Sequence, residues 1–358
     1  MQIFCQCLCV IILIIIIIIL ILFVLNNKRC MYQYKNNFAA SFSVMVYYPA
    51  FSVSVWQGIR PLSNSNYLFC GTGANKEGII YIGNAQTTST VLNVTMSYPN
   101  AATTSIYGPN YIGNNIYNFV GTYTPTTSSS NLNYSFIYTG SLGSSNINNA
   151  SNYSTINLPS SNVSFAHSVM NGLCVINGGN TANGNVANSY IYNINTRTFT
   201  QIKIPKYKTV TAYGIYYNEG VYTIVGGCSA KSIGIASIYV NGIPTAYGSA
   251  YILDYNSTTG KFSNFTILNI PGGGIFTHIQ GICYNGKSFS LSMDTVTVGR
   301  NISTGYFGIA ERGTKGFVLN NYVSIGNSFT ANSVADNVVC GIVRNGSSIK
   351  PYQAVISS

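Results

Sequence analysis

The sequence predicts an all-β chain folded as a six-bladed β-propeller, closed by an N-terminal strand and preceded by one transmembrane helix. Three observations predict this: short strand-like runs between turns, a phrase that recurs about every 50 residues, and a long apolar stretch near the N-terminus. Only 6% of the residues are charged, whereas roughly 25% is usual in soluble domains. Because hydroxyl and amide side chains supply most of the polarity, the composition favours an exported or virion-type surface.

The recurring phrase begins at a proline and reaches a glycine nine or ten residues later. Four copies have both residues: PAFSVSVWQGI (49–59), PNAATTSIYGP (99–109), PKYKTVTAYGI (205–215) and PGGGIFTHIQG (271–281). A fifth copy, PSSNVSFAHSV (159–169), aligns Val169 with the glycine, and a sixth, SFTANSVADN (328–337), lacks the proline. The copies start roughly 45 to 67 residues apart, a period that indicates propeller blades.

The proline and the glycine have different predicted places in a blade. Proline cannot donate to a sheet ladder, so we expect it at the end of the outermost strand, which is an edge. We expect the glycine on the inner strand, where neighbouring backbones approach closely near the axis. Between the phrases, runs rich in Ile, Val, Thr, Tyr and Phe predict the remaining strands.

The last blade is predicted to lack its outer strand. After the sixth copy only VVCGIV (338–343) and YQAVIS (352–357) remain, whereas the chain has a spare strand, SFSVMVYYP (41–49), before the first copy. We therefore expect this N-terminal strand to complete the last blade and close the ring.

The units resemble kelch-like and HAF-type extracellular repeats, with their GI-x-x-N-x-V-G and Y-x-x-Y segments. The double glycine of kelch blades is present at Gly178–Gly179 and Gly226–Gly227. Composition and anchor are also similar to those of surface or virion proteins of giant DNA viruses. The resemblance covers about residues 41–358 and implies an architecture; no functional residue is carried over from it.

Four segments are predicted along the chain: a flank (1–9), a transmembrane core (10–25), a juxtamembrane linker (26–40) and the propeller (41–358). The core, VIILIIIIIILILFVL, extends with Phe4 to Cys9 to about 22 apolar residues, enough to cross a bilayer. A cleaved signal peptide is the alternative, but its apolar region is shorter and ends in small residues. Because NNKRC follows here, we expect an uncleaved single-pass anchor.

The orientation of the anchor is ambiguous. Lys28, Arg29 and Lys35 follow the apolar segment, which places the propeller in the cytosol under the positive-inside rule. The composition favours an extracellular, luminal or virion-surface propeller, which is our expectation. Asn-x-Ser/Thr sequons fit a glycoprotein, but this composition yields about as many by chance.

The cysteines divide into two groups. Cys5, Cys7 and Cys9 lie in the flank before the transmembrane core. They are interpreted either as acylation sites or as small apolar residues of the helix. Beyond the anchor lies an even set, and its members after Cys30 mostly fall in apolar strand-like runs: Cys30, Cys70, Cys174, Cys228, Cys283 and Cys340. We expect buried thiols there, with disulfides as the alternative.

The scarcity of carboxylates bears on function. The chain has six Asp and Glu residues in total, whereas glycoside hydrolysis usually needs two carboxyl groups at one bond. We therefore predict a non-catalytic binding or structural surface module, with a protein or glycan partner, no cofactor and no specific nucleic acid. The alternatives are an exported carbohydrate-active hydrolase or lyase and a cytosol-facing membrane scaffold.

Two groups of residues are candidate ligand contacts. His167 and His278 are expected in loops just before their inner strands, at one mouth of the central channel. Two histidines with Asp294 as a third ligand would suit a metal, but the preferred interpretation is a polar lining equivalent to Thr211, without metal.

The second group is the densest basic cluster, Lys203, Lys206 and Lys208 with Tyr207 among them. We expect Lys203 and Lys206 on a blade edge, where lysines protect against edge-to-edge pairing. Contact with an anionic glycan is the alternative.

Overall fold

The structure is a computed structural model that describes residues 42–49, 52–63, 65–86, 90–127, 132–179, 187–230, 232, 248–271, 276–296 and 303–357. The compact unit that contains them spans Phe42–Ser358. The predicted flank, anchor and linker (1–9, 10–25 and 26–40) lie outside these residues. Within the described ranges, no helix combines the length and apolar character needed to cross a membrane.

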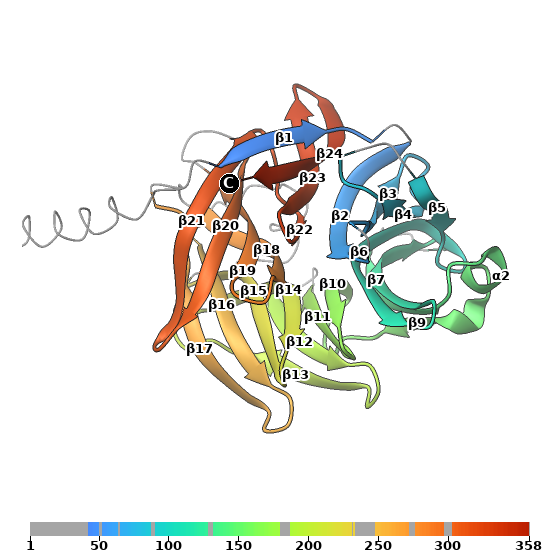
Figure 1. Ribbon diagram of the computed structural model, residues 1–358. Coiled ribbons are helices and arrows are strands. Elements are labelled where there is room, and N and C mark those ends of the chain that lie inside the picture. Colours follow the sequence, from blue (N-terminus) through green and yellow to red (C-terminus); the bar gives the residue numbers. More distant parts are fainter. Residues whose placement is uncertain are drawn as a thin grey trace, which may run out of the picture. The chain divides into compact units, whose positions relative to one another are not determined.

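Six four-stranded antiparallel sheets stand around a central axis, which confirms the predicted six-bladed propeller (Figure 1). We number the blades by their inner strands. Blade 1 contains β2 (Val53–Pro61), β3 (Tyr67–Gly73), β4 (Gly78–Gly83) and β5 (Thr90–Met96). Blade 2 contains β6 (Ala101–Gly113), β7 (Ile116–Pro125), β8 (Tyr134–Gly140) and β9 (Tyr153–Ile156). Blade 3 contains β10 (Val163–Met170), β11 (Leu173–Gly179), β12 (Asn188–Asn193) and β13 (Thr198–Ile202).

The other three blades repeat this plan. Blade 4 contains β14 (Thr209–Asn218), β15 (Val221–Ser229), β16 (Ser249–Asn256) and β17 (Lys261–Ile267). Blade 5 contains β18 (Phe276–Tyr284), β19 (Phe289–Val296), β20 (Ser303–Gly313) and β21 (Gly316–Asn327). Blade 6 contains β22 (Ser333–Ala335), β23 (Val338–Asn345), β24 (Ser348–Ser357) and β1 (Ser43–Tyr47). Only one turn of α-helix, α2 (Ser144–Ile147), and one 3-10 turn, η1 (Ala150–Asn152), interrupt the described strands.

The hydrophobic core is divided among the interfaces between neighbouring blades. One cluster, for example, packs Trp56, Phe69 and Tyr81 of blade 1 against Val338 and Val355 of blade 6. Because every blade is covered on both faces, its central strands have few exposed positions: all residues of β4 and β11 are buried. Continuous apolar runs, rather than strict alternation, are expected for such strands.

The glycine of the repeated phrase lies on an inner strand, as predicted. A Cβ atom added to Gly108 would lie 2.6 Å from the Cα atom of Ser168 in the next blade, and one added to Gly281 would lie 2.8 Å from the Cα atom of Ser333. Real Cβ atoms do not approach other atoms so closely, so these inner strands can pack only where one lacks a side chain.

Two details of the repeat differ from the predictions. In the fifth copy the structural equivalent of the glycine is Ser168, not Val169, because His167 is bulged out of the ladder. The prolines lie beyond the outer strands rather than in them: Pro205 follows β13 by three residues and Pro99 follows β5 by three. Proline therefore marks the crossing to the next blade, after the ladder has ended.

The N-terminal strand closes the ring, as predicted. β1 pairs antiparallel with β24, from Ser43 opposite Ser357 to Tyr47 opposite Gln353. In Figure 1, β1 (blue) runs along the outside of the last, red blade. We call this pair the latch. The buried thiols are also confirmed, since the five described cysteines are free and buried.

One side chain on the axis connects four blades. Arg60 of β2 donates from Nη1 to the carbonyl of Ile282 at 3.1 Å, and from Nη2 to Ser168 Oγ and the carbonyl of Ile215, both at 2.9 Å. These acceptors belong to the inner strands of blades 5, 3 and 4. Arg60 is 6% exposed, so these bonds fix the inner strands relative to one another in a region without bulk water.

We expect Gly108→Ala to lower the free energy of unfolding by about 2–3 kcal/mol, because the added methyl group overpacks against the backbone of the next blade. Chemical denaturation of the full chain measures this change. Gly143→Ala is the matched control, since its Cβ would have no neighbour closer than 3.8 Å. Equal stability of the two variants would contradict the close packing of the inner strands.

Candidate functional site

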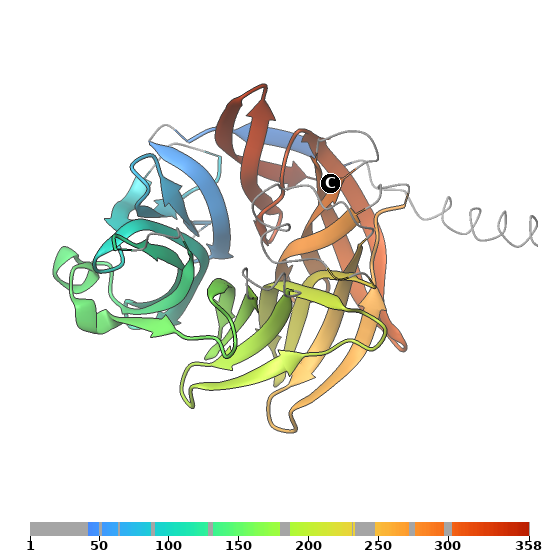
Figure 2. The same ribbon diagram turned by 180° about the vertical axis from the view of Figure 1, so that it is seen from behind.

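A β-bulge recurs at the same place in five of the inner strands. The register of each strand with its neighbour skips one residue, and the skipped residues are Gln57, Tyr107, His167, Tyr213 and Gln280. A bulge leaves its extra residue outside the ladder and redirects the side chain. Because the glycine or serine that follows packs against the next blade, these bulges lie where the inner strands come together, around the axis seen in Figures 1 and 2.

Aromatic rings from successive blades meet at this level. The ring centroids of Tyr107 and His167 are 5.0 Å apart, those of His167 and Tyr213 are 4.9 Å apart, and those of Tyr213 and His278 are 5.4 Å apart. Four inner strands, β6, β10, β14 and β18, each supply one ring. The result is a continuous arc of aromatic and imidazole side chains around part of the axis.

A carboxyl group lies at the end of this arc. Asp294 of β19 is directly opposite His278 in the ladder, with 3.6 Å between its Oδ2 atom and the Nε2 atom of His278. Gln280 Nε2 lies 2.7 Å from His278 Nε2 and donates to Asp294 Oδ2 at 3.3 Å. The backbone N–H of Ala331, which leads into blade 6, donates to Asp294 Oδ1 at 2.6 Å. The six residues of this axial cluster are Tyr107, His167, Tyr213, His278, Gln280 and Asp294.

Burial sets the protonation states of the cluster. It raises the pKa of Asp294 to about 7, although the bonds from Ala331 and Gln280 act in the opposite direction. It lowers the pKa of His278 to about 4, and burial together with His278 lowers the pKa of His167 to about 3. At neutral pH both imidazoles are therefore uncharged, and the contact between His278 and Asp294 is not an ion pair.

The uncharged imidazole of His278 has one N–H donor and one acceptor nitrogen. The tautomer of the ring decides which of the two faces the amide of Gln280. Asp294 can hold or release a proton near pH 7, which is the range that suits a general acid or base. The axial cluster thus combines one acid–base carboxyl group with neutral polar and aromatic partners.

The predicted positions of the two histidines are wrong. His167 lies within β10 and His278 within β18, not in loops before those strands. His167 is the bulged residue of its strand, whereas His278 is paired with Asp294 in the ladder. Their place at a mouth of the central channel stays a prediction. Tyr213 contacts the rings of both, and no group of three or more His, Cys, Asp or Glu in the described ranges is arranged to hold a metal ion.

The predicted basic cluster is at the surface. Lys203, Lys206 and Lys208 are exposed, and they lie in the crossing between β13 and β14, so the predicted location on a blade edge is wrong. Lys206 adopts a positive φ of 74° in the turn. The Tyr207 ring packs 6.0 Å from the ring of Phe265 on the outer strand of blade 4, so a basic and aromatic surface extends over two blades.

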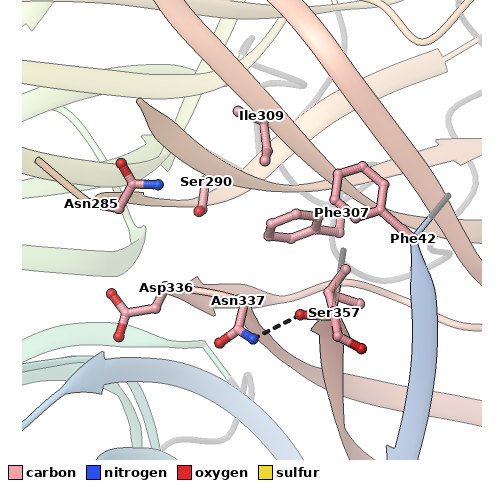
Figure 3. A pocket seen from close by; sticks show the side chains of 9 residues that line it. Phe42, Asn285, Ser290, Phe307, Ile309, Asp336, Asn337 and Ser357 are labelled. Atoms are coloured by element: carbon pink, nitrogen blue, oxygen red, sulfur yellow. Dashed lines mark hydrogen bonds between the residues drawn. The ribbon is translucent and has the colours of Figure 1, made fainter. Parts of the chain in front are cut away.

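A pocket of about 410 Å³ opens between blade 5 and the latch. Figure 3 shows Asn285, Ser290 and Asp336 on one side and the rings of Phe42 and Phe307 on the other. Burial raises the pKa of Asp336. The volume of the pocket lies in the range of small-molecule sites. Its polar side and its aromatic side suit a small molecule with one polar and one apolar face.

Sequence reasoning missed Tyr107, Tyr213 and Gln280. The tyrosines stand in β-rich phrases where sheet packing is the ordinary interpretation of Tyr. The available signal was positional: each of the three residues immediately precedes the glycine of the repeated phrase. The pocket beside the latch had no signal, because it forms between segments from opposite ends of the propeller.

Comparison with known proteins agrees on the fold. No protein-family model and no curated protein matches the sequence. Among solved structures, Trypanosoma rangeli sialidase in complex with sialic acid aligns over 89% of this chain and 59% of its own, with 8% identity and a TM-score of 0.54. This chain therefore spans less than two thirds of the sialidase.

Two other solved structures align at lower TM-scores. The protein YjhT aligns over 85% of this chain and 98% of its own, with 8% identity and a TM-score of 0.47. An ulvan lyase of polysaccharide lyase family PL25 aligns over 87% and 84%, with 12% identity and a TM-score of 0.43. At such identities the likeness concerns the fold alone.

We expect Asp294→Asn to become more stable relative to the wild type as the pH rises. The folded chain binds the Asp294 proton more tightly than the unfolded chain does, because its pKa is raised from 3.8 to about 7. The stability that this group contributes at low pH is therefore lost between about pH 4 and pH 7. Asparagine resembles the protonated carboxyl group and cannot ionise.

The measurement is urea unfolding of both proteins from about pH 5 to pH 8, over which the difference in unfolding free energy should change by on the order of 2 kcal/mol. The two histidines titrate in both proteins, so the comparison isolates Asp294. A difference that does not vary with pH would show that the carboxyl group has an ordinary pKa.

Proposed function

We propose that this propeller is a carbohydrate-active protein that works at the axial cluster, with Asp294 as its acid–base group. The observation that carries the proposal is the buried carboxyl of Asp294, held beside the neutral imidazole of His278 and the amide of Gln280. Titratable groups with strongly shifted pKa values concentrate at functional sites. The neighbouring tyrosine and histidine rings offer flat apolar faces of the kind that pack on sugar rings.

The distribution of carboxylates favours elimination over hydrolysis. Hydrolysis by the usual route needs a second carboxyl group, and the other described acids lie elsewhere. Asp254 of β16 pairs with Arg312 at 2.8 Å, and Glu311 is exposed on β20. Glu77, Glu219 and Asp336 lie between strands.

An elimination needs fewer catalytic carboxyl groups than hydrolysis does. A base removes a proton from carbon, a C=C bond forms as the glycosidic C–O bond breaks, and the leaving oxygen takes up a proton. A carboxyl group that exchanges protons near pH 7 can take part in both transfers. The carbon acid must be activated by a neighbouring carboxyl group, so the substrate class is a polysaccharide that contains uronic acid. A sialidase with bound sialic acid has the same fold, so the fold is compatible with carbohydrate chemistry.

The second candidate function is non-catalytic binding of a glycan or protein partner, the function that the composition favours. The observation behind it is the exposed basic and aromatic surface formed by Lys203, Lys206, Lys208, Tyr207 and Phe265. Lysines with neighbouring aromatic rings suit an anionic glycan.

Incubation of the full chain with a panel of neutral and uronic-acid polysaccharides tests the first candidate. We expect new chain ends and the ultraviolet absorbance of a C=C bond from a uronic-acid substrate, with Asp294→Asn reducing the rate about 100-fold or more. Glu311→Gln, which changes an exposed carboxylate, is the matched control and should retain the rate. Binding without cleavage, lost on replacement of the three lysines by serine, would instead support the second candidate. An unchanged rate in Asp294→Asn would overturn the role of the cluster.

Membrane attachment through residues 10–25 and an extracellular, luminal or virion-surface propeller are also part of the proposal. Their support is the apolar, uncharged stretch and the low charge of the chain. The likeness to kelch-like repeats and to viral surface proteins stays a prediction. A cytosol-facing scaffold is the alternative, supported by the positive charge after the anchor.

Synthesis of the full chain with microsomes distinguishes these orientations. We expect the propeller to be protected from added protease and to show a mass shift that endoglycosidase removes. A chain that stays attached to the membrane, but is digested and carries no glycan, would place the propeller in the cytosol. Release of a chain shortened at its N-terminus would show a cleaved signal peptide.

A further inference from the structure

The pocket between blade 5 and the latch contains a carboxyl group without a cationic partner. Asp336 lies in the turn between β22 and β23, and its Oδ1 atom is 3.9 Å from the thiol sulfur of Cys283. Among the described residues, neither ion pair includes Asp336, and no Lys or Arg lines the pocket. Burial raises the pKa of Asp336, whereas a neighbouring cation would lower it. The pocket therefore offers an uncompensated negative charge to a ligand.

The polar groups that face this carboxyl group are mainly acceptors. Asn337 donates from Nδ2 to the carbonyl of Ile356 at 2.7 Å. Because that carbonyl can only accept, the amide oxygen of Asn337 is the atom left for the pocket, and Figure 3 shows it on the side of Asp336. The hydroxyl of Ser290, on β19, points into the pocket from the other side. A carboxylate, an amide oxygen and a hydroxyl thus line one space.

Donors are scarce in the same space. The amide of Asn285 is used within its own turn, where Nδ2 donates to Ser288 Oγ at 3.1 Å and Oδ1 accepts from the backbone N–H of Ser288 at 2.8 Å. The hydroxyl of Ser357 is paired with that of Ser43 at 2.7 Å. A sugar hydroxyl both donates and accepts, so a polyhydroxyl ligand would lack donors here. An ammonium group has three N–H donors and no acceptor, which matches the lining.

The remaining wall of the pocket is apolar. The rings of Phe42 and Phe307 meet edge to face, with their centroids 6.0 Å apart, and Figure 3 shows Ile309 beyond them. A volume of about 410 Å³ gives room for a ring-sized group beside an ammonium group. Aromatic faces also attract a cation. The wall and the acceptors together suit a ligand with a charged amine and a hydrocarbon part.

We propose that this pocket binds a primary ammonium compound that carries an aromatic or similarly sized apolar group. The ammonium group pairs with Asp336 and donates to Asn337 and Ser290, and the apolar group packs on Phe42 and Phe307. The ion pair offsets the cost of the partly buried carboxylate. This site does not involve the axial cluster, so the inference goes beyond the proposed carbohydrate chemistry and does not depend on it.

Calorimetric titration of the full chain in nonionic detergent with phenethylamine tests the proposal. Phenethyl alcohol is the matched neutral probe, phenylacetate is the anionic probe, and detergent alone is the blank. We expect a dissociation constant for the amine on the order of 1 mM or below. The other two probes should bind at least about 10-fold more weakly, because charge-assisted hydrogen bonds are the stronger ones. Equal affinity for the amine and the alcohol would overturn the proposal.

Two variants locate the binding. Asp336→Asn should weaken amine binding about 10-fold or more, and asparagine tolerates the positive φ of 51° at this position. Glu219→Gln is the matched control, because it also removes one negative charge from a turn residue with a positive φ, here 48°, and should retain the wild-type affinity. Unchanged binding in Asp336→Asn, or an equal loss in both variants, would contradict the site. If Asp336→Asn fails to fold, the comparison of the three probes on the wild type still decides.

Discussion

The close approach of the inner strands at the axis is the constraint on which the rest of this structure depends. At Gly108 and Gly281 the backbone of the next blade leaves no room for a side chain. The residue immediately before each of these glycines lies outside the ladder, as Tyr107 and Gln280 do. The close packing accounts for glycine at these positions, and the bulges beside it place four of the six residues of the axial cluster: Tyr107, His167, Tyr213 and Gln280.

Polar groups at the axis follow from the same constraint. The inner strands converge there, and their carbonyl groups must find donors away from bulk water. Arg60 supplies donors to two of these carbonyls and to the hydroxyl of Ser168, from a single side chain that crosses the axis. Asp294 supplies an acceptor instead, because its carboxyl group accepts a hydrogen bond from the backbone N–H of Ala331. Arg60 therefore bonds to Ser168, the residue that follows His167 of the axial cluster.

The sequence was sufficient for the architecture because that part of the problem is periodic. A proline and a glycine at fixed spacing mark the crossing and the inner strand of each blade, and the missing last strand could be matched to the spare first one. The axial cluster was not predictable to the same degree, because which residue leaves the ladder depends on register. His278 faces Asp294 only because a bulge at Gln280 shifts the pairing by one residue. The same effect makes Ser168, rather than Val169, the equivalent of glycine. Arg60 gave no local signal at all, since its partners lie more than 100 residues away.

The latch brings the two ends of the propeller together. Ser43 and Ser357 are opposite one another in the ladder, and their hydroxyl oxygens are 2.7 Å apart. Every blade then packs between two neighbouring blades, including blade 6, which contains both ends of the propeller. The order of the blades around the ring therefore does not depend on where the chain begins. Joining residues 43 and 357 through a short linker and opening another crossing between blades would preserve all six sheets in a permuted order.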